Sequence, residues 1–254
     1  ESYRKIRNTF RYILGNINDK YEKIDFMKLE ISNFPELEQY MFNKIFNLNS
    51  KFVKNFENYN FHTLYKDLLN FCTVDLSAFY FDIRKDCLYC DSTDSKKRKY
   101  TITFLNVLLE ILLRWFAPIL SFTTEEIYSI INTNGKKSIH LESFSSLPSN
   151  WDNKLLEKKW NELIKIREIC NSSIELKRAT KEIGSSLEAN LIININEKMI
   201  KLTKDTDFSE LCITSDAKIN KINSNEILVE TIKAEGEKCP ICWKISKNPC
   251  ERHS

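Results

Sequence analysis

Apolar residues at the start of the chain recur at helical spacing. Between residues 2 and 14 an apolar side chain stands at every third or fourth position, at Tyr3, Ile6, Phe10 and Ile13. Residues three or four apart lie on one face of a helix, so this spacing predicts an amphipathic helix. Gly15 and Asn16 follow directly, and both residue types favour a helix end.

A helical hairpin is expected next. The helical pattern returns from about residue 34 to residue 58, and the polar residues 58–60 interrupt it. A second apolar stripe then begins, at Phe61, Leu64, Leu68 and Phe71. Two helices joined by such a short polar turn are expected to pack side by side.

The most apolar helix of the chain is expected after residue 99. The lysine-rich stretch 91–99 predicts a loop, and the apolar positions that follow are Leu105, Leu108, Leu109, Leu112 and Phe116. Pro118 should end this helix, because proline lacks the backbone N–H that a helix interior needs. Thr123 and Glu126 have the spacing of a capping box, which predicts a further helix running through Ile131.

The pattern changes in the last third of the chain. A long amphipathic helix is predicted from Trp151 to about Gly184, with its apolar face at Leu156, Trp160, Leu163, Cys170 and Ile174. Alternating apolar residues then indicate strands, at Leu187, Leu191, Ile193 and Ile195 and again at residues 211–213 and 227–229. A small α+β unit is therefore expected after the long helix.

The sequence as a whole predicts a mainly α protein. We expect a helical bundle over residues 1–150, the long helix and α+β unit over 151–232, and a terminal knuckle over 233–254. Only 4 glycines and 5 prolines argue against a turn-rich all-β fold. No apolar run is long enough for a membrane span and the first residues do not resemble a signal peptide, so we expect a cytoplasmic protein without a membrane partner.

The strongest chemical signal is a paired set of ligands at the end of the chain. Cys239 and Cys242 are separated by two residues, and so are Cys250 and His253. Two tight turns of this kind can direct three thiolates and one imidazole at a single ion, which favours tetrahedral Zn²⁺. A closed set of four ligands leaves no position for water, so the zinc should be structural. The alternative is a set of unpaired thiols in a frayed tail.

The seven-residue spacer between the two pairs carries Trp243, Lys244 and Lys247. An aromatic ring beside basic groups suits stacking on an unpaired base while the lysines meet phosphate. Trp243 covering the small core of the knuckle is an equally good interpretation. The other cysteines are expected to act as small apolar side chains: Cys72, Cys87, Cys90, Cys170 and Cys212.

A second candidate RNA contact lies in the first predicted helix. The formal net charge of the chain is only +3, so a polyanion must be met by local basic patches. Arg4, Arg7 and Arg11 form one stripe of the helix, and arginines on one face can follow a phosphate backbone. A solvated surface stripe is at least as good an interpretation from the sequence alone.

Nothing in the chain indicates catalysis. His62 and His140 have no serine or cysteine beside them in a nucleophile motif, and no glycine-rich phosphate loop is present. A structural role is the better interpretation for both histidines. We therefore predict no catalytic residue in this chain.

Several stretches together resemble bacterial isoleucyl-tRNA synthetase, a class I enzyme. They are YRKIRNTFRYILG (3–15), FCTVDLSAFYFDIRKD (71–86), RWFAPILSFTTEE (114–126), GSSLEA (184–189) and AEGEKCPICW (234–243). The class I synthetases for valine, leucine and methionine share the helical bundle, whereas the cysteine knuckle is similar to the isoleucine enzyme. The resemblance implies a C-terminal region whose bundle docks on the anticodon stem and loop of tRNA(Ile), helped by the small domain and the zinc knuckle.

The same resemblance implies that the chemistry lies upstream of residue 1. The full enzyme would join isoleucine to its tRNA using ATP, bound only in a catalytic domain absent here, and would clear mischarged valine in a separate editing domain. Residues 244–248 (KISKN) resemble the family's KMSKS motif, but they lie between two ligand pairs and are treated as a coincidence. The spacer before Cys250 is also shorter than usual, and the final ligand is His253. A monomer is expected.

Two other classes of protein stay open at this point. The chain could be a stand-alone helical interaction protein whose knuckle holds a protein partner. An unrelated metalloenzyme is disfavoured, because the predicted ligand set is closed. Binding to RNA separates the synthetase interpretation from the first alternative.

Overall fold

The computed structural model describes residues 1–17, 21–132 and 137–253, and it divides into two compact units. The first unit comprises Glu1–Asn153, and the second begins at Lys154. All regular elements among the described residues of the first unit are helices, whereas the second unit combines helices with two small sheets. This agrees with the mainly α fold and the small α+β unit predicted from the sequence.

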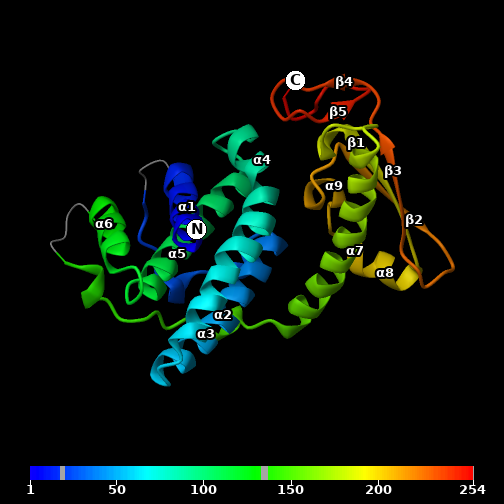
Figure 1. Cartoon of the computed structure of the whole chain (residues 1–254). Helices are drawn as coiled ribbons and strands as arrows, with labels where there is room; N and C mark the ends of the chain where they lie inside the picture. Colours follow the sequence, from blue (N-terminus) through cyan, green and yellow to red (C-terminus); the bar gives the residue numbers. More distant parts are fainter. Residues whose placement is uncertain (18–20, 133–136, 254) are drawn as a thin grey trace. The chain divides into compact units, whose positions relative to one another are not determined.

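The first unit is a bundle built around the apolar helix α5 (Figure 1). Its helices are α1 (Ser2–Ile17), α2 (Glu36–Glu57), α3 (Phe61–Asn70), the π-helical segment η3 (Phe71–Phe81), α4 (Asp82–Cys90), α5 (Lys96–Phe116) and α6 (Ser121–Ile131). Short 3₁₀ turns lie at Phe26–Lys28, Ile31–Asn33, Ile139–Leu141 and Ser149–Trp151. Helix α5 contacts α1, α2, α4 and α6, and so forms the centre of the bundle.

The composition of α5 explains its central position. Nearly every side chain from Phe104 to Phe116 is buried, which removes a continuous apolar cylinder from water. Ser95 caps the helix by accepting a hydrogen bond from the backbone N–H of Arg98. The last helical residue is Phe116, two residues before Pro118, as the sequence predicted.

A buried ion pair joins four elements of this bundle. Glu38 of α2 accepts two hydrogen bonds of 2.6 Å from the guanidinium of Arg84 in α4. Its carboxylate also accepts bonds from Tyr80 of η3, at 2.9 Å, and from Thr101 of α5, at 3.4 Å. Glu38 is 0% exposed and Arg84 is 3% exposed. Burial and the neighbouring carboxylate raise the pKa of Tyr80 well above its usual value, so the phenol stays a donor.

Two element boundaries in the first unit, at the end of α1 and at the start of α5, differ from the prediction. Helix α1 continues through Gly15 to Ile17, because the buried Ile17 side chain holds the last turn and one helical glycine costs only about 1 kcal/mol. The predicted loop 91–99 is shorter, since the Ser95 cap starts α5 at Lys96.

The predicted capping box before α6 is also wrong. Helix α6 begins at Ser121, so Thr123 already lies in its first turn. The residue before the helix is Leu120, which supplies no side-chain cap. The Thr123 hydroxyl instead bonds the phenol of Tyr3 at 3.0 Å. Tyr3 is 47% exposed, so its side chain lies at the edge of the bundle and not in its core.

The second unit places one long helix against a three-stranded sheet. Helix α7 (Lys154–Ala179) contacts β1 and β3, as Figure 1 shows in yellow-green. The strand order is β2-β1-β3, with β1 (Ala189–Ile195) parallel to β2 (Asp216–Lys221) and antiparallel to β3 (Leu228–Lys233). The remaining elements are η6 (Ser186–Glu188), α8 (Glu197–Thr203), α9 (Phe208–Leu211), β4 (Glu237–Lys238) and β5 (Ile245–Ser246).

Strand β1 shows why the sheet forms. Its residues alternate between buried and half-buried positions over its whole length, as the sequence pattern predicted. The buried positions are Ala189, Leu191, Ile193 and Ile195. Strand β3 begins at Leu228, close to the predicted stretch at 227–229.

Two expectations for the second unit are corrected. Helix α7 is shorter than predicted: Trp151 lies in the preceding 3₁₀ turn, and the helix ends at Ala179, with Lys181 in a left-handed conformation at φ 60°. Residues 211–213 are not a strand, because the Asp207 carboxylate caps α9 and Ile213 has φ 58°. The sheet uses residues 216–221 instead, where exposed lysines obscure the alternation.

None of the helices among the described residues is both long and apolar enough to cross a membrane.

Candidate metal centre and nucleic-acid interface

The two-stranded sheet β4–β5 carries the first ligand pair at its turn. The backbone N–H of Cys239 donates to the carbonyl of Lys244 at 2.9 Å, and the N–H of Trp243 donates to the carbonyl of Cys239 at 3.0 Å. Gly236 precedes β4 with φ 124°, and a Cβ there would lie 2.2 Å from the carbonyl oxygen of Ser246. Only glycine allows the two strands to approach so closely at this point.

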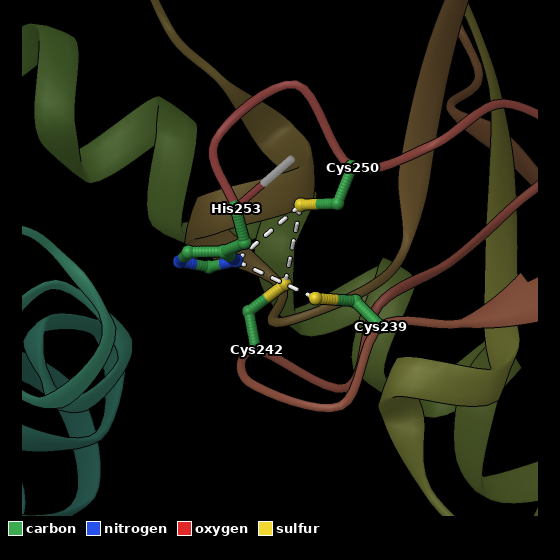
Figure 2. Close-up of side chains that lie close together, drawn as sticks. All are labelled: Cys239, Cys242, Cys250 and His253. Carbon is green, nitrogen blue, oxygen red and sulfur yellow. Dashed lines mark hydrogen bonds between the residues drawn. The ribbon is translucent and has the colours of Figure 1, made fainter.

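The second ligand pair comes from a separate turn near the end of the described chain. The backbone N–H of His253 donates to the carbonyl of Cys250 at 2.9 Å, which brings the two side chains to the same side of that turn. Figure 2 shows all four side chains pointing toward one another. The ligand atoms of Cys239, Cys242, Cys250 and His253 lie within 4.8 Å of one another.

The separations between these atoms match the edges of a small tetrahedron. The sulfurs of Cys242 and Cys250 are 3.9 Å apart, and Nδ1 of His253 lies 3.4 Å from the sulfurs of Cys239 and Cys250. Zinc bonds of about 2.3 Å to sulfur and about 2.0–2.1 Å to nitrogen give tetrahedral edges of about 3.8 Å and about 3.6 Å. The donor set and its dimensions therefore fit Zn²⁺.

The knuckle shifts the pKa values of its first two thiols in opposite directions. Backbone N–H groups of Cys242 and Ile241 point at the Cys239 sulfur and lower the pKa of that thiol to about 6. Burial raises the pKa of Cys242 to about 11. The remaining cysteines are different in kind: Cys72, Cys87, Cys170 and Cys212 are buried and Cys90 is half-buried, which agrees with their expected role as small apolar side chains.

Trp243 stands out of the knuckle instead of covering it. Its side chain is 58% exposed. Its backbone has φ 65°, in the left-handed region. A left-handed conformation is costly for a bulky side chain and common for glycine or asparagine. The Nζ atom of Lys238 lies 5.2 Å from the centroid of the indole, within the range of a cation–π contact. The knuckle therefore carries an exposed indole, Trp243, with the ammonium group of Lys238 beside it.

The two spacer lysines have different surroundings. Lys244 donates to the hydroxyl of Ser209 in α9 at 3.1 Å and is half-buried. Lys247 is exposed and forms a 2.7 Å ion pair with Glu235. An exposed pair of this kind contributes little to stability, so a phosphate can replace the carboxylate. The sequence analysis did not single out Lys238 as a neighbour of Trp243, although it stands directly before Cys239.

The arginine stripe lies on the open face of α1. Arg4, Arg7 and Arg11 are all exposed, whereas Ile6, Phe10 and Ile13 on the other face are buried. Within residues 1–17, 21–132 and 137–253, no ion pair engages these arginines. The stripe is thus a basic surface of the bundle that the described acidic residues leave unneutralised.

The two histidines outside the knuckle both lie at the surface of the bundle. His62 is exposed at the start of α3, and His140 is exposed in a 3₁₀ turn. A catalytic histidine needs a nucleophile or a second orienting group within hydrogen-bond distance. Residues 244–248 lie in and beside β5, between the two ligand pairs, as expected.

A helical bundle with exposed arginines, followed by a cysteine-rich knuckle with an exposed tryptophan, is an arrangement that suits nucleic-acid binding. Residues 38–193 match the model of the anticodon-binding domain of tRNA ligase, and the chain belongs to this family. The description of this family names the anticodon of a tRNA as what such a domain binds.

The relatives identify the kind of tRNA ligase that the chain resembles. It is 61% identical over 254 residues to the isoleucine–tRNA ligase of Pelagibacter ubique, covering 100% of this chain and 28% of that protein. It is 36% identical over 258 residues to the isoleucine–tRNA ligase of Agrobacterium fabrum, covering 97% and 26%. The chain thus spans about a quarter of the length of these relatives, and the resemblance to the isoleucine enzymes is confirmed.

Proposed function

We propose that this chain is the C-terminal, tRNA(Ile)-binding region of an isoleucine–tRNA ligase, and that it carries no catalytic residue of its own. The observation that supports this most strongly is similarity to isoleucine–tRNA ligases over the whole chain, together with the match to an anticodon-binding domain. The ATP-dependent joining of isoleucine to tRNA then belongs to other parts of the full protein. A cytoplasmic, monomeric enzyme remains our prediction.

We further propose that the knuckle binds one structural Zn²⁺ through Cys239, Cys242, Cys250 and His253. Three sulfurs and one nitrogen at tetrahedral separations support this ligand set. Four protein ligands occupy every position of a tetrahedral ion, so no water is available for hydrolysis. In this proposal residues 1–150 form the anticodon-binding bundle, residues 151–232 the α+β unit and residues 233–254 the metal-bound knuckle.

Two surfaces are proposed to contact the tRNA. Arg4, Arg7 and Arg11 would meet phosphates, because all three are exposed on one helix face. In the knuckle, Trp243 would stack on an unpaired base, while Lys244 and Lys247 would sit beside phosphate or ribose. The exposed indole and the cation beside it support this assignment.

Filter binding to tRNA(Ile) and tRNA(Val), at two salt concentrations, tests the proposal. We expect preferential binding of tRNA(Ile) that weakens as salt rises, because phosphate contacts release counterions. A chain that binds neither tRNA at low salt would contradict the proposal and would favour the alternative of a stand-alone helical interaction protein.

The arginine stripe gives the first prediction. Changing Arg4, Arg7 and Arg11 together to glutamine should weaken tRNA binding and reduce the slope of log K against log salt by about 2–3, since each lost phosphate contact removes about 0.9 from it. Filter binding across a salt series measures this slope. A matched control changes three exposed lysines of the bundle outside α1 to glutamine, Lys28, Lys85 and Lys96. An unchanged slope in the triple variant would show that the stripe is only a solvated surface.

The knuckle gives the second prediction. Trp243→Gly should weaken tRNA binding roughly 5- to 100-fold, because one base–aromatic stack contributes about 1–3 kcal/mol. The knuckle should stay folded, since glycine adopts φ 65° without strain. Trp243→Phe should retain most of the affinity. If Trp243→Gly instead lowered the melting temperature and left tRNA affinity intact, the indole would be a structural cover.

A further inference from the structure

The tip of the α2–α3 hairpin displays a tyrosine from a strained backbone position. Tyr59 has φ 56° and its side chain is 80% exposed. Its N–H donates to the carbonyl of Phe56 at 3.1 Å, and the N–H of Asn60 donates to the carbonyl of Asn55 at 2.8 Å, so the turn is closed on both sides. The left-handed conformation disfavours tyrosine, and nothing in the packing of the bundle requires a large ring here.

Other rings support this tyrosine from one side. Phe61 is 47% exposed, and its centroid lies 6.0 Å from that of Tyr59 with the planes at 83°. Phe56 lies behind Phe61 at 5.8 Å and is itself packed on Phe144 at 4.8 Å. The exposed ring of Tyr59 therefore belongs to an aromatic cluster whose base is anchored in the bundle.

The surroundings of the cluster are basic. Lys51 and Lys54 are exposed on the last turns of α2, and Lys66 is exposed on α3. None of the three forms an ion pair with a residue that the structure describes. Glu57 is the one exposed acidic residue between Lys51 and Lys66, so the tip carries an excess of positive charge.

The same combination occurs in the knuckle. Four residues other than glycine have positive φ in the described chain, and two of them are the exposed aromatics Tyr59 and Trp243. Lys238 lies over the Trp243 ring, and the exposed Lys54 stands five residues before Tyr59 in the same hairpin. Exposed rings with cations beside them are the groups that hold unpaired nucleotides, whereas a protein-docking surface is usually depleted of lysine.

We propose that the Tyr59 ring, supported by Phe61, stacks on an unpaired nucleotide of the bound tRNA, with Lys54 and Lys51 facing the adjoining phosphates. This inference rests on the proposed function and adds a second stacking position, in the bundle, to the one in the knuckle. The closed turn fixes the backbone at Tyr59, and the edge contact with Phe61 supports its ring, so less entropy is lost when a base stacks on it.

Tyr59→Asn tests the stacking role without loss of the turn, because asparagine tolerates the left-handed conformation. In filter binding of the full chain to tRNA(Ile), this variant should bind roughly 5- to 100-fold more weakly, from about 1–3 kcal/mol per stacked base and 1.4 kcal/mol per tenfold change. Its salt slope should be unchanged, since no phosphate contact is lost. Lys51→Gln with Lys54→Gln should instead lower that slope by about 2.

Two control variants, Tyr59→Phe and Phe122→Ala, show whether a loss of affinity is specific to the Tyr59 ring. Tyr59→Phe keeps the ring and should retain wild-type affinity. Phe122→Ala removes a ring that is 93% exposed on α6, away from the tip, and should also bind normally. Chemical probing should show one unpaired base that wild-type chain protects and Tyr59→Asn leaves reactive.

Three results would overturn the inference, and they separate it from the proposed function. Wild-type binding with an unaffected Tyr59→Asn variant would refute the stacking position alone. An equal loss in Phe122→Ala would show a general effect of exposed rings. A wild-type chain that binds no tRNA would refute the proposed function, and the stacking position with it.

Discussion

Removal of the proposed zinc ion is expected to unfold residues 237–253 while the rest of the chain stays folded. The knuckle has almost no apolar core of its own: Cys239 and Cys242 are buried, but the residues around them are mostly exposed. Binding of Zn²⁺ to such sites has an apparent free energy of about 10–16 kcal/mol near neutral pH, which is then the folding free energy of the module.

Hydrogen exchange with and without a chelator measures this effect. Amides of the β4–β5 hairpin, including the N–H of Cys239 and Trp243 in its turn, should lose protection on chelation and regain it when zinc is added back. Amides of α5 and α7 serve as the internal reference and should not change. Retention of protection in β4 and β5 after complete metal removal would show that the hairpin folds without an ion.

Ligand variants make the zinc prediction specific. Cys239→Ser and His253→Ala should each lower the zinc content below one ion per chain after dialysis. Cys90→Ser changes a half-buried cysteine of the other unit and should leave the zinc content unchanged. A His253→Ala chain with full and equally tight zinc would mean that another group completes the site.

Replacing Glu38 by alanine is expected to destabilise the bundle by about 3–5 kcal/mol. The substitution leaves the guanidinium of Arg84 buried without its partner, and an uncompensated buried charge is costly. It also removes the acceptor of Tyr80 and one acceptor of Thr101. Because these groups come from η3 and α5, the effect should extend across the bundle.

Peptide-resolved hydrogen exchange locates this loss of stability. Protection should fall in α2, α4 and α5, whereas amides of β1 and α7 in the second unit should keep theirs. Asp94→Asn, which breaks the exposed pair with Lys99, should cost about 0–1 kcal/mol.

The double variant Glu38→Met with Arg84→Met provides the complementary measurement. It removes both charges and should recover most of the lost stability. An Asp94→Asn effect as large as that of Glu38→Ala would contradict the argument from burial.

Local patterns predicted the elements well wherever one face of the element is buried. The apolar stripe of α1 at Ile6, Phe10 and Ile13 and the alternation in β1 both follow from burial of one side, so the periodicity of the sequence predicts them directly. Helix ends were less predictable. Gly15 and Thr123 carry end signals that packing overrode, because a buried Ile17 and an earlier start of α6 decided the boundary.

The sequence by itself determined the helical class of the bundle, the order of its elements and the two Cys/His pairs that the knuckle brings together. These depend on residues close together in the chain: periodic apolar positions define helix faces, and a two-residue spacing defines a ligand turn. Only the tertiary structure decided that Glu38 meets Arg84, that Lys238 lies over Trp243, and that Tyr59 exposes its ring from a left-handed backbone conformation. Such contacts depend on how whole elements pack together, and the spacing of residues along the chain does not predict that packing.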